Sequence, residues 1–138
     1  MSAEVSNFRL NVLRLVYLLI FVLFGSRIWP VIIDPSGLWD PIEGVAYSFW
    51  AAFSLLAVLG IRYPLKMLPL LFIQLTYKSI WLVAVGIQLW QADKIDQSAA
   101  ELIRSNTIGV IIDLLVIPWP YVWANYIAKP KHNKNSET

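Results

Sequence analysis

A long apolar stretch with one charge near its middle constrains this chain most. It runs from residue 63 to residue 90 and carries Lys78 close to its centre. About 20 consecutive apolar residues are enough to cross the hydrocarbon core of a bilayer. Because a lysine at the bilayer midplane costs at least about 2.5 kcal/mol, its amine should face the protein interior and have a partner there. The stretch therefore predicts a membrane helix with a buried polar position.

The composition also favours lipid as the solvent. Apolar residues make up 58% of the chain and charged residues 14%, whereas soluble domains have about 45–50% and about 25%. The 7 Trp and 6 Tyr lie mostly near the ends of apolar segments, where aromatic rings gather at the membrane–water boundary. An integral membrane protein is predicted, with the lipid bilayer as its first partner.

Four apolar segments are long enough to be spans. The expected membrane helices cover residues 8–29, 42–60, 64–90 and 102–127, and the last helix is expected to begin before its span, from about Ser98. Pro118 and Pro120 lie inside the last of these, and a proline within a helix removes a backbone hydrogen bond, so the helix should kink or break there. The predicted fold is all-α: four transmembrane helices in an antiparallel bundle.

The links between the spans carry their own signals. Residues 30–41 contain two Asp-Pro pairs and a Ser-Gly, which predict a loop. Asp40 and Pro41 are suited to the N-cap and first position of the second helix. Pro69 lies about a turn inside the expected third span and could bend it.

The basic residues indicate an orientation. They cluster on one side of the four expected spans: Arg9, Arg14, Arg62, Lys66, Lys129, Lys131 and Lys134. The other two links have an acidic excess, so the positive-inside rule places both termini in the cytoplasm. Arg14 is interpreted as a topology anchor that extends back to the headgroups, with a functional role as the alternative. Residues 129–138 are expected to be a basic, disordered tail, and in a bacterium the membrane would be the inner one, because outer-membrane spans are barrels.

Polar residues on the third and fourth spans define a candidate site. At about 100° per residue, one stripe of the third helix holds Gln74, Tyr77, Lys78, Trp81 and Gln88. On the fourth helix, Asn106, Gly109 and Asp113 share a face by the same count. Membrane helices turn polar side chains inward, so the two faces should meet. The predicted site residues are Lys78, Asp113, Gln74, Tyr77, Trp81 and Asn106.

The depth of the two charges predicts an ion pair. Counting inward from the expected outer ends, 90 − 78 gives 12 residues and 113 − 102 gives 11 residues. At about 1.5 Å per residue both charges lie about 17–18 Å deep. A buried pair of Lys78 and Asp113 is therefore expected, completed by neighbouring hydrogen bonds. Such a pair fits two interpretations: a structural lock between helices, or a site at which Lys78 binds an anionic or carbonyl group or the pair relays a proton.

Several function classes find no support in the sequence. The chain has no cysteine, and its one histidine, His132, lies in the polar tail, so no metal cluster or thiol chemistry is predicted. Phosphate-binding glycine motifs, catalytic motifs and extended basic patches are also missing. We expect no enzymatic activity, no cofactor, no metal site, and no nucleotide or nucleic-acid partner.

Small residues on the second span indicate a helix contact. Gly44, Ser48 and Ala52 recur every four residues and share one face, which allows two helix backbones to approach closely in lipid. The face could pack within the bundle or form a homo-oligomer interface. Two functions stay open: a ligand-binding or transport-related membrane protein, or an accessory or structural subunit without chemistry of its own.

Three segments in the second half carry a resemblance. They are residues 62–69, 77–82 and 116–122, which read RYPLKMLP, YKSIWL and VIPWPYV. With these segments the chain resembles a group of small bacterial integral membrane proteins that have four spans and no assigned function. The resemblance implies the membrane fold and no activity.

Overall fold

The computed structural model describes residues 4–128, and these residues form helices and turns without a strand. The elements are α1 (Asn7–Leu19), the π-helical turn η1 (Ile20–Phe24), α2 (Gly25–Ile33), α3 (Pro41–Arg62), α4 (Leu68–Trp81), the π-helical turn η2 (Leu82–Gly86), α5 (Ile87–Gln91), α6 (Gln97–Val116), α7 (Trp119–Val122) and the π-helical turn η3 (Trp123–Ile127). The predicted all-helical fold is confirmed. The predicted tail, residues 129–138, lies outside the described residues.

Three helices are long and apolar enough to cross a membrane. They are Asn7–Ile33, which joins α1, η1 and α2; Pro41–Arg62; and Leu68–Gln91, which joins α4, η2 and α5. A fourth span results if α6 is counted together with the segment that follows it across a bend of 73°. The fold is thus that of a membrane-embedded helical protein.

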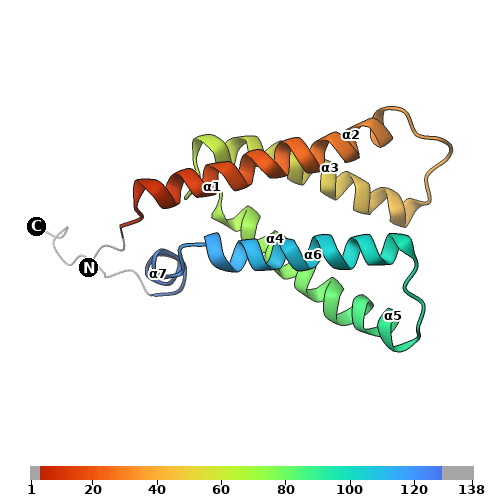
Figure 1. Ribbon diagram of the computed structural model, residues 1–138. Coiled ribbons are helices and arrows are strands. Elements are labelled where there is room, and N and C mark those ends of the chain that lie inside the picture. Colours follow the sequence, from red (N-terminus) through yellow and green to blue (C-terminus); the bar gives the residue numbers. More distant parts are fainter. Residues whose placement is uncertain (1–3, 129–138) are drawn as a thin grey trace, which may run out of the picture.

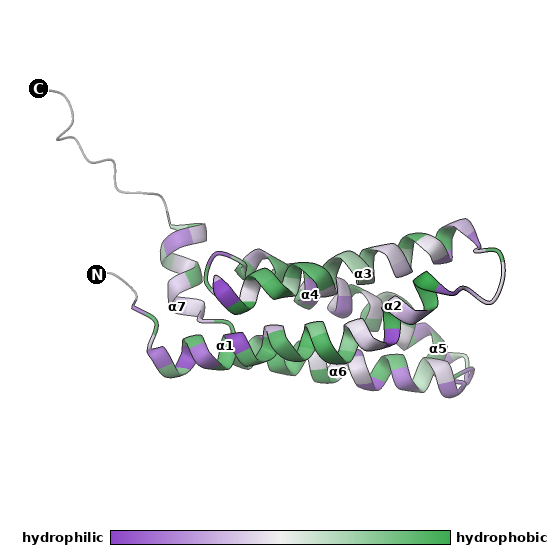
Figure 2. Ribbon diagram, turned by 90° about the horizontal axis from the view of Figure 1, so that it is seen from above, coloured by the Kyte–Doolittle hydropathy of each residue, from purple (hydrophilic) through white to green (hydrophobic). Residues whose placement is uncertain are grey.

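Two helical hairpins make up the molecule (Figure 1). The first pairs α1–α2 with α3, and the second pairs α4–α5 with α6. The links over residues 34–40 and 92–96 lie at one end, which we call the loop end. The beginning of α1, the connection over residues 63–67 and α7 lie at the other, which we call the terminal end. Figure 2 shows hydrophilic residues at the start of α1 and around the link between α5 and α6, with hydrophobic residues along the helix middles.

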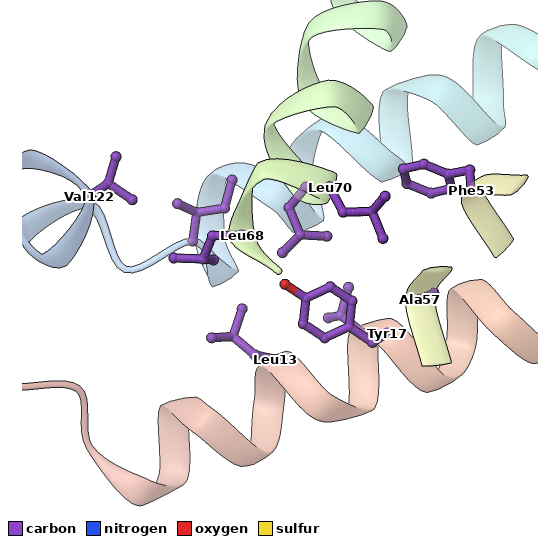
Figure 3. Close-up of a cluster of buried hydrophobic side chains, with 10 residues drawn as sticks. Leu13, Tyr17, Phe53, Ala57, Leu68, Leu70 and Val122 are labelled. Carbon is purple, nitrogen blue, oxygen red and sulfur yellow. The ribbon is translucent and has the colours of Figure 1, made fainter. Parts of the chain in front are cut away.

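The main apolar core lies toward the terminal end and joins the two hairpins (Figure 3). Its buried side chains are Leu13, Val16, Tyr17, Phe53, Ala57, Leu68, Leu70, Leu71, Ile117 and Val122. Tyr17 of α1 is fully buried, and its hydroxyl donates a hydrogen bond to the Pro64 carbonyl at 3.0 Å. A Cβ added at Gly60 of α3 would collide with the Tyr17 ring, so this glycine permits the close approach of α1 and α3.

A second contact joins the first hairpin nearer the loop end. Trp29 of α2 donates its indole N–H to the Ser54 hydroxyl of α3 at 3.1 Å. Ser54 in turn donates to the Ala51 carbonyl at 2.8 Å, so its hydroxyl is satisfied although the residue is fully buried. Gly25 lies beside Ser54, where an added Cβ would make an ordinary contact of 3.6 Å.

The predicted bounds of the second helix and its cap are close to those observed. The Asp40 carboxylate accepts hydrogen bonds from the amides of Ile42 at 2.9 Å and Glu43 at 3.1 Å. Pro41 occupies the first turn, where its missing N–H has no helical partner to lose. The predicted N-cap is therefore confirmed.

Two proline interpretations were wrong. The first helix continues through Pro30 to Ile33, so the loop covers residues 34–40 and not 30–41. Pro30 lies in the last turn, where it removes a single hydrogen bond, and its own carbonyl accepts from the Asp34 amide at 3.0 Å. The third helix begins at Leu68 rather than at residue 64, which places Pro69 in the first turn, where it causes no bend.

The fourth helix begins close to the expected early start near Ser98. Asp96 caps α6 by accepting from the Ala99 amide at 2.7 Å, so the helix begins at Gln97, five residues before the expected span start at residue 102. The helix ends at Val116, and the chain turns by 73° into α7. The break expected at Pro118 and Pro120 is confirmed, and the segment after it, α7, lies across the terminal end (Figure 1).

Candidate functional site

Asp113 of α6 is fully buried and is held by Gln74 of α4. The Gln74 amide nitrogen Nε2 lies 2.9 Å from Oδ1 and 2.9 Å from Oδ2 of Asp113, and it donates to both. A carboxylate buried in an apolar surrounding is stable only when hydrogen bonds replace the water it has lost. The pair thus gives α4 and α6 a polar contact in the interior of the second hairpin.

Lys78 lies one helical turn beyond Gln74 and packs over Gly109 of α6. A Cβ added at Gly109 would collide with the Lys78 amine and would lie 2.9 Å from its Cδ, so the glycine leaves the space that the lysine fills. Within residues 4–128, Lys78 donates no hydrogen bond to Asp113 and forms no ion pair within 4.0 Å. The predicted close ion pair of Lys78 and Asp113 is therefore not formed in this part of the chain.

The axial register of the two helices explains this difference. Asp113 lies 113 − 97 = 16 residues from the loop-end start of α6, and Lys78 lies 91 − 78 = 13 residues from the loop end of its own span. At about 1.5 Å per residue these depths are about 24 Å and about 20 Å. Asp113 is therefore level with Gln74, whereas Lys78 is level with Gly109.

The other predicted site residues lie around this lysine in different directions. The Tyr77 ring faces α3, and its centroid is 6.0 Å from the Lys78 amine. Asn106 is buried on α6, and the register places it level with Trp81, which is half-buried. Neither Trp81 nor Asn106 hydrogen-bonds to another predicted site residue in the described part of the chain. The structure thus joins Gln74 to Asp113 and Lys78 to Gly109 without bringing all six residues into mutual contact.

An aromatic cluster that the sequence analysis did not include borders the site. Tyr77 packs edge-on against Phe49 and Phe53 of α3, with ring centroids 5.6 Å and 6.5 Å apart. Phe24 continues the cluster, 6.1 Å from Trp50 and 6.3 Å from Phe53. The spacing of Phe49, Trp50 and Phe53 along one helix could have indicated it. Its rings place apolar surface between the two hairpins, beside the lysine.

Two surface pockets lie away from Lys78. One, of about 430 Å³, is lined by Arg14, Val58, Ile61 and Arg62. The other, of about 240 Å³, lies at the loop end and is lined by Val31, Pro35, Ser36, Gly37, Leu38, Trp39, Glu43 and Tyr47. Within residues 4–128, no three His, Cys, Asp or Glu side chains form a group that could hold a metal ion.

Fold and site together define a class: a membrane-embedded helical protein with a polar contact inside one hairpin and a lysine beside it. No family model, curated protein or solved structure matches this chain.

Proposed function

We propose that this chain is a multi-pass membrane protein that binds a small molecule beside Lys78, and that the ligand carries an anionic or carbonyl oxygen. One observation carries the proposal. Both oxygens of Asp113, the nearby carboxylate, accept hydrogen bonds from Gln74, and the Lys78 amine is left without a protein acceptor among the described residues.

The position of the amine makes an acceptor necessary. Lys78 lies ten residues from the start of the Leu68–Gln91 span, about 15 Å deep at about 1.5 Å per residue. An ammonium group at this depth is costly in hydrocarbon. A ligand oxygen would provide a charge-assisted hydrogen bond, which is roughly twice as strong as a neutral one. We propose that the amine recognises the polar end of its ligand.

The neighbouring aromatic rings suit the apolar part of the same ligand. Tyr77, Phe49 and Phe53 form contacts between α4 and α3 next to the lysine. Small-molecule sites commonly combine apolar and aromatic walls with a few polar groups that fix orientation. We therefore propose an amphiphilic or largely apolar ligand that enters from the lipid, such as a long-chain carboxylate or a quinone-like carbonyl compound.

The orientation and oligomeric state are further proposals. Arg9, Arg14, Arg62 and Lys66 lie toward the terminal end, which we propose to be cytoplasmic, in the inner membrane of a bacterium. Ser48 and Ala52 are exposed on α3 and Gly44 is half-buried beside Trp39, so most of the small-residue face is left uncovered by this bundle. We propose that it contacts a second copy of the chain. Transport would require such an oligomer, because four helices enclose little volume. In the alternative function, an accessory subunit of a larger complex, the same face would contact the partner protein.

Photolabelling tests the ligand proposal. Purified protein in nanodiscs would be irradiated with a diazirine-bearing long-chain fatty acid, and labelled peptides would be mapped by mass spectrometry. We expect adducts on peptides from α4 and α6 around Lys78. Replacing Lys78→Met should lower this labelling about tenfold, the effect of losing one hydrogen bond to a charged group.

Matched probes and variants make the test specific. Lys94→Met removes an exposed lysine at the loop end and should leave the labelling unchanged. A diazirine-bearing long-chain alcohol, which lacks the anion, should label the same peptides weakly, and a diazirine-bearing quinone tests the carbonyl class. Equal labelling of the wild type and the Lys78→Met variant by both the fatty acid and the quinone would refute the proposal.

A further inference from the structure

The pocket between α1 and α3 at the terminal end has one basic and one apolar half. Arg14 and Arg62 supply the charge, and Val58 and Ile61 supply the apolar lining. Its volume is about 430 Å³. It is separate from the site beside Lys78, because none of its lining residues belongs to α4 or α6.

Arg14 is held in place by its neighbours. Its Nε donates to the Ile61 carbonyl, in the last turn of α3, at 3.2 Å. Its Nη1 donates to the Asn11 side chain at 2.9 Å. Arg14 therefore lies level with the last turn of α3 at the terminal end. With Nε and Nη1 engaged, the remaining N–H groups of a fixed guanidinium are available to an anion, at little cost in side-chain entropy.

Further positive charge lies around the same helix end. Arg62 donates from Nε to the Tyr63 hydroxyl at 3.3 Å, and its guanidinium lies 5.6 Å from the centre of that ring. The Lys66 amine lies 5.4 Å from the same ring. None of Arg14, Arg62 and Lys66 forms an ion pair with a carboxylate of the described residues. The pocket therefore has a positive potential that no carboxylate within residues 4–128 neutralises.

Apolar tracks lead from the two arginines toward the membrane interior. On α3, Leu55 and Val58 precede Arg62 on one side of the helix, and they are 56% and 40% exposed. On α1, Leu18 lies one turn deeper than Arg14 and is 43% exposed. Two cations at the helix end above two apolar tracks match a molecule with an anionic head and two acyl chains.

We infer that this pocket binds an anionic phospholipid. The phosphate would lie between Arg14 and Arg62, where guanidinium groups can donate paired hydrogen bonds to its oxygens. The acyl chains would lie along Leu18 of α1 and along Leu55 and Val58 of α3. A zwitterionic lipid presents its own ammonium group to the same cations, so an anionic headgroup should be preferred.

Native mass spectrometry can measure this preference. The protein would be released from nanodiscs that contain equal amounts of phosphatidylglycerol and phosphatidylcholine with identical chains. We expect the wild type to retain more phosphatidylglycerol, and Arg62→Gln to lower the ratio of the two lipids several-fold. Arg14→Gln combined with Arg62→Gln should lower the ratio about tenfold, because each basic side chain contributes to attraction of an anionic lipid.

Controls separate a lipid site from general effects. Arg27→Gln combined with Arg104→Gln removes two exposed arginines nearer the loop end and should leave the lipid ratio unchanged. Arg14→Lys keeps the charge if Arg14→Gln alters the fold, and should keep most of the preference. Lys78→Met should also leave the ratio unchanged, so the two sites can fail independently.

Two results would overturn the inference. The first is an unchanged lipid ratio in Arg62→Gln and in the double variant. The second is complete displacement of the bound lipid by millimolar glycerol 3-phosphate, which would identify the headgroup alone as the ligand. Retention of phosphatidylglycerol in the presence of glycerol 3-phosphate, with loss in the arginine variants, supports the phospholipid site.

Discussion

The Gln74 amide nitrogen lies 2.9 Å from each carboxylate oxygen of Asp113, between α4 and α6. Asp113 is fully buried, and Gln74 is the donor that satisfies it. A neutral amide therefore occupies the place at which a lysine was predicted. Because Gln74 holds the carboxylate, the Lys78 amine one turn away is left for another acceptor, and this arrangement underlies the proposed ligand site.

Replacing Gln74→Leu should destabilise the bundle. The substitution leaves the Asp113 carboxylate buried without its donor, and we expect a loss of about 1.5–3 kcal/mol, the range for a hydrogen bond to a charged group. The free energy of unfolding would be measured by denaturant titration in mild detergent. The double variant Gln74→Leu with Asp113→Leu should cost less than the sum of the two single variants, by about 0.5–3 kcal/mol. Lys78→Met combined with Asp113→Leu should show a smaller coupling energy than the Gln74 and Asp113 pair. A larger coupling energy for Lys78 and Asp113 would support the ion pair between these two residues instead.

Gly109→Ala should displace the Lys78 amine while the fold is kept. The added Cβ would collide with the end of a flexible side chain, which can move, so we expect a change in stability within about 1 kcal/mol. Photolabelling of α4 and α6 by the fatty acid should nevertheless fall. Gly86→Ala is the matched control, because its nearest contact would be an ordinary 3.6 Å from the Trp81 ring. Equal labelling of both variants and the wild type would contradict the placement of the amine over Gly109.

Gly60→Ala should weaken the core at the terminal end. Its Cβ would collide with the Tyr17 ring, which is fully buried and fixed by the hydrogen bond to Pro64. Overpacking of this kind costs about 1–3 kcal/mol. Gly25→Ala, which adds a methyl group at an ordinary contact distance from Ser54, should be close to neutral. Thermal unfolding in detergent would compare the two variants, and a similar midpoint for both would contradict the tight packing at Gly60.

A single cysteine on the small-residue face tests the proposed homo-oligomer. The natural chain contains no cysteine, so a disulfide in Ser48→Cys can form only between two copies. Oxidation in native membranes should yield a covalent dimer, seen on a non-reducing gel. Val83→Cys places the thiol on an exposed position of η2 and should yield little dimer. A dimer of equal yield in both variants would indicate random collision.

Two further cysteine variants test the orientation. Gly37→Cys lies in the loop-end link, where an added side chain meets no atom within 4 Å, and Lys66→Cys lies in the exposed connection at the terminal end. A membrane-impermeant maleimide added to intact cells should label Gly37→Cys. Lys66→Cys should react only after the membrane is permeabilised. The reverse pattern would place the terminal end outside the cell.

A constant helical period predicts the inward-facing residues of α4 but fails for Gln88, beyond the π-helical turn η2. Gln74 and Lys78 lie on the α6-facing side of α4, as about 100° per residue predicts. The same count placed Gln88 on this stripe, yet Gln88 is exposed. The π-helical turn η2 lies between Lys78 and Gln88. Because a π-helical turn contains more residues than an α-helical turn, it rotates the side chains of α5 relative to those of α4. Nothing in residues 82–86 marked this turn in advance.

Local sequence signals determined the helical membrane character, the Asp40 cap and the break at Pro118, because apolar length, cap geometry and proline stereochemistry act within a few residues of one segment. Tertiary structure decided which residues of α4 and α6 lie opposite each other. That relationship depends on where each helix begins, which the Asp96 cap sets for α6. It also depends on the packing of Lys78 against Gly109. A shift of one turn along the helix axis leaves each helical face unchanged, so the sequence could identify the inward-facing residues but could not decide whether Asp113 meets Lys78 or Gln74.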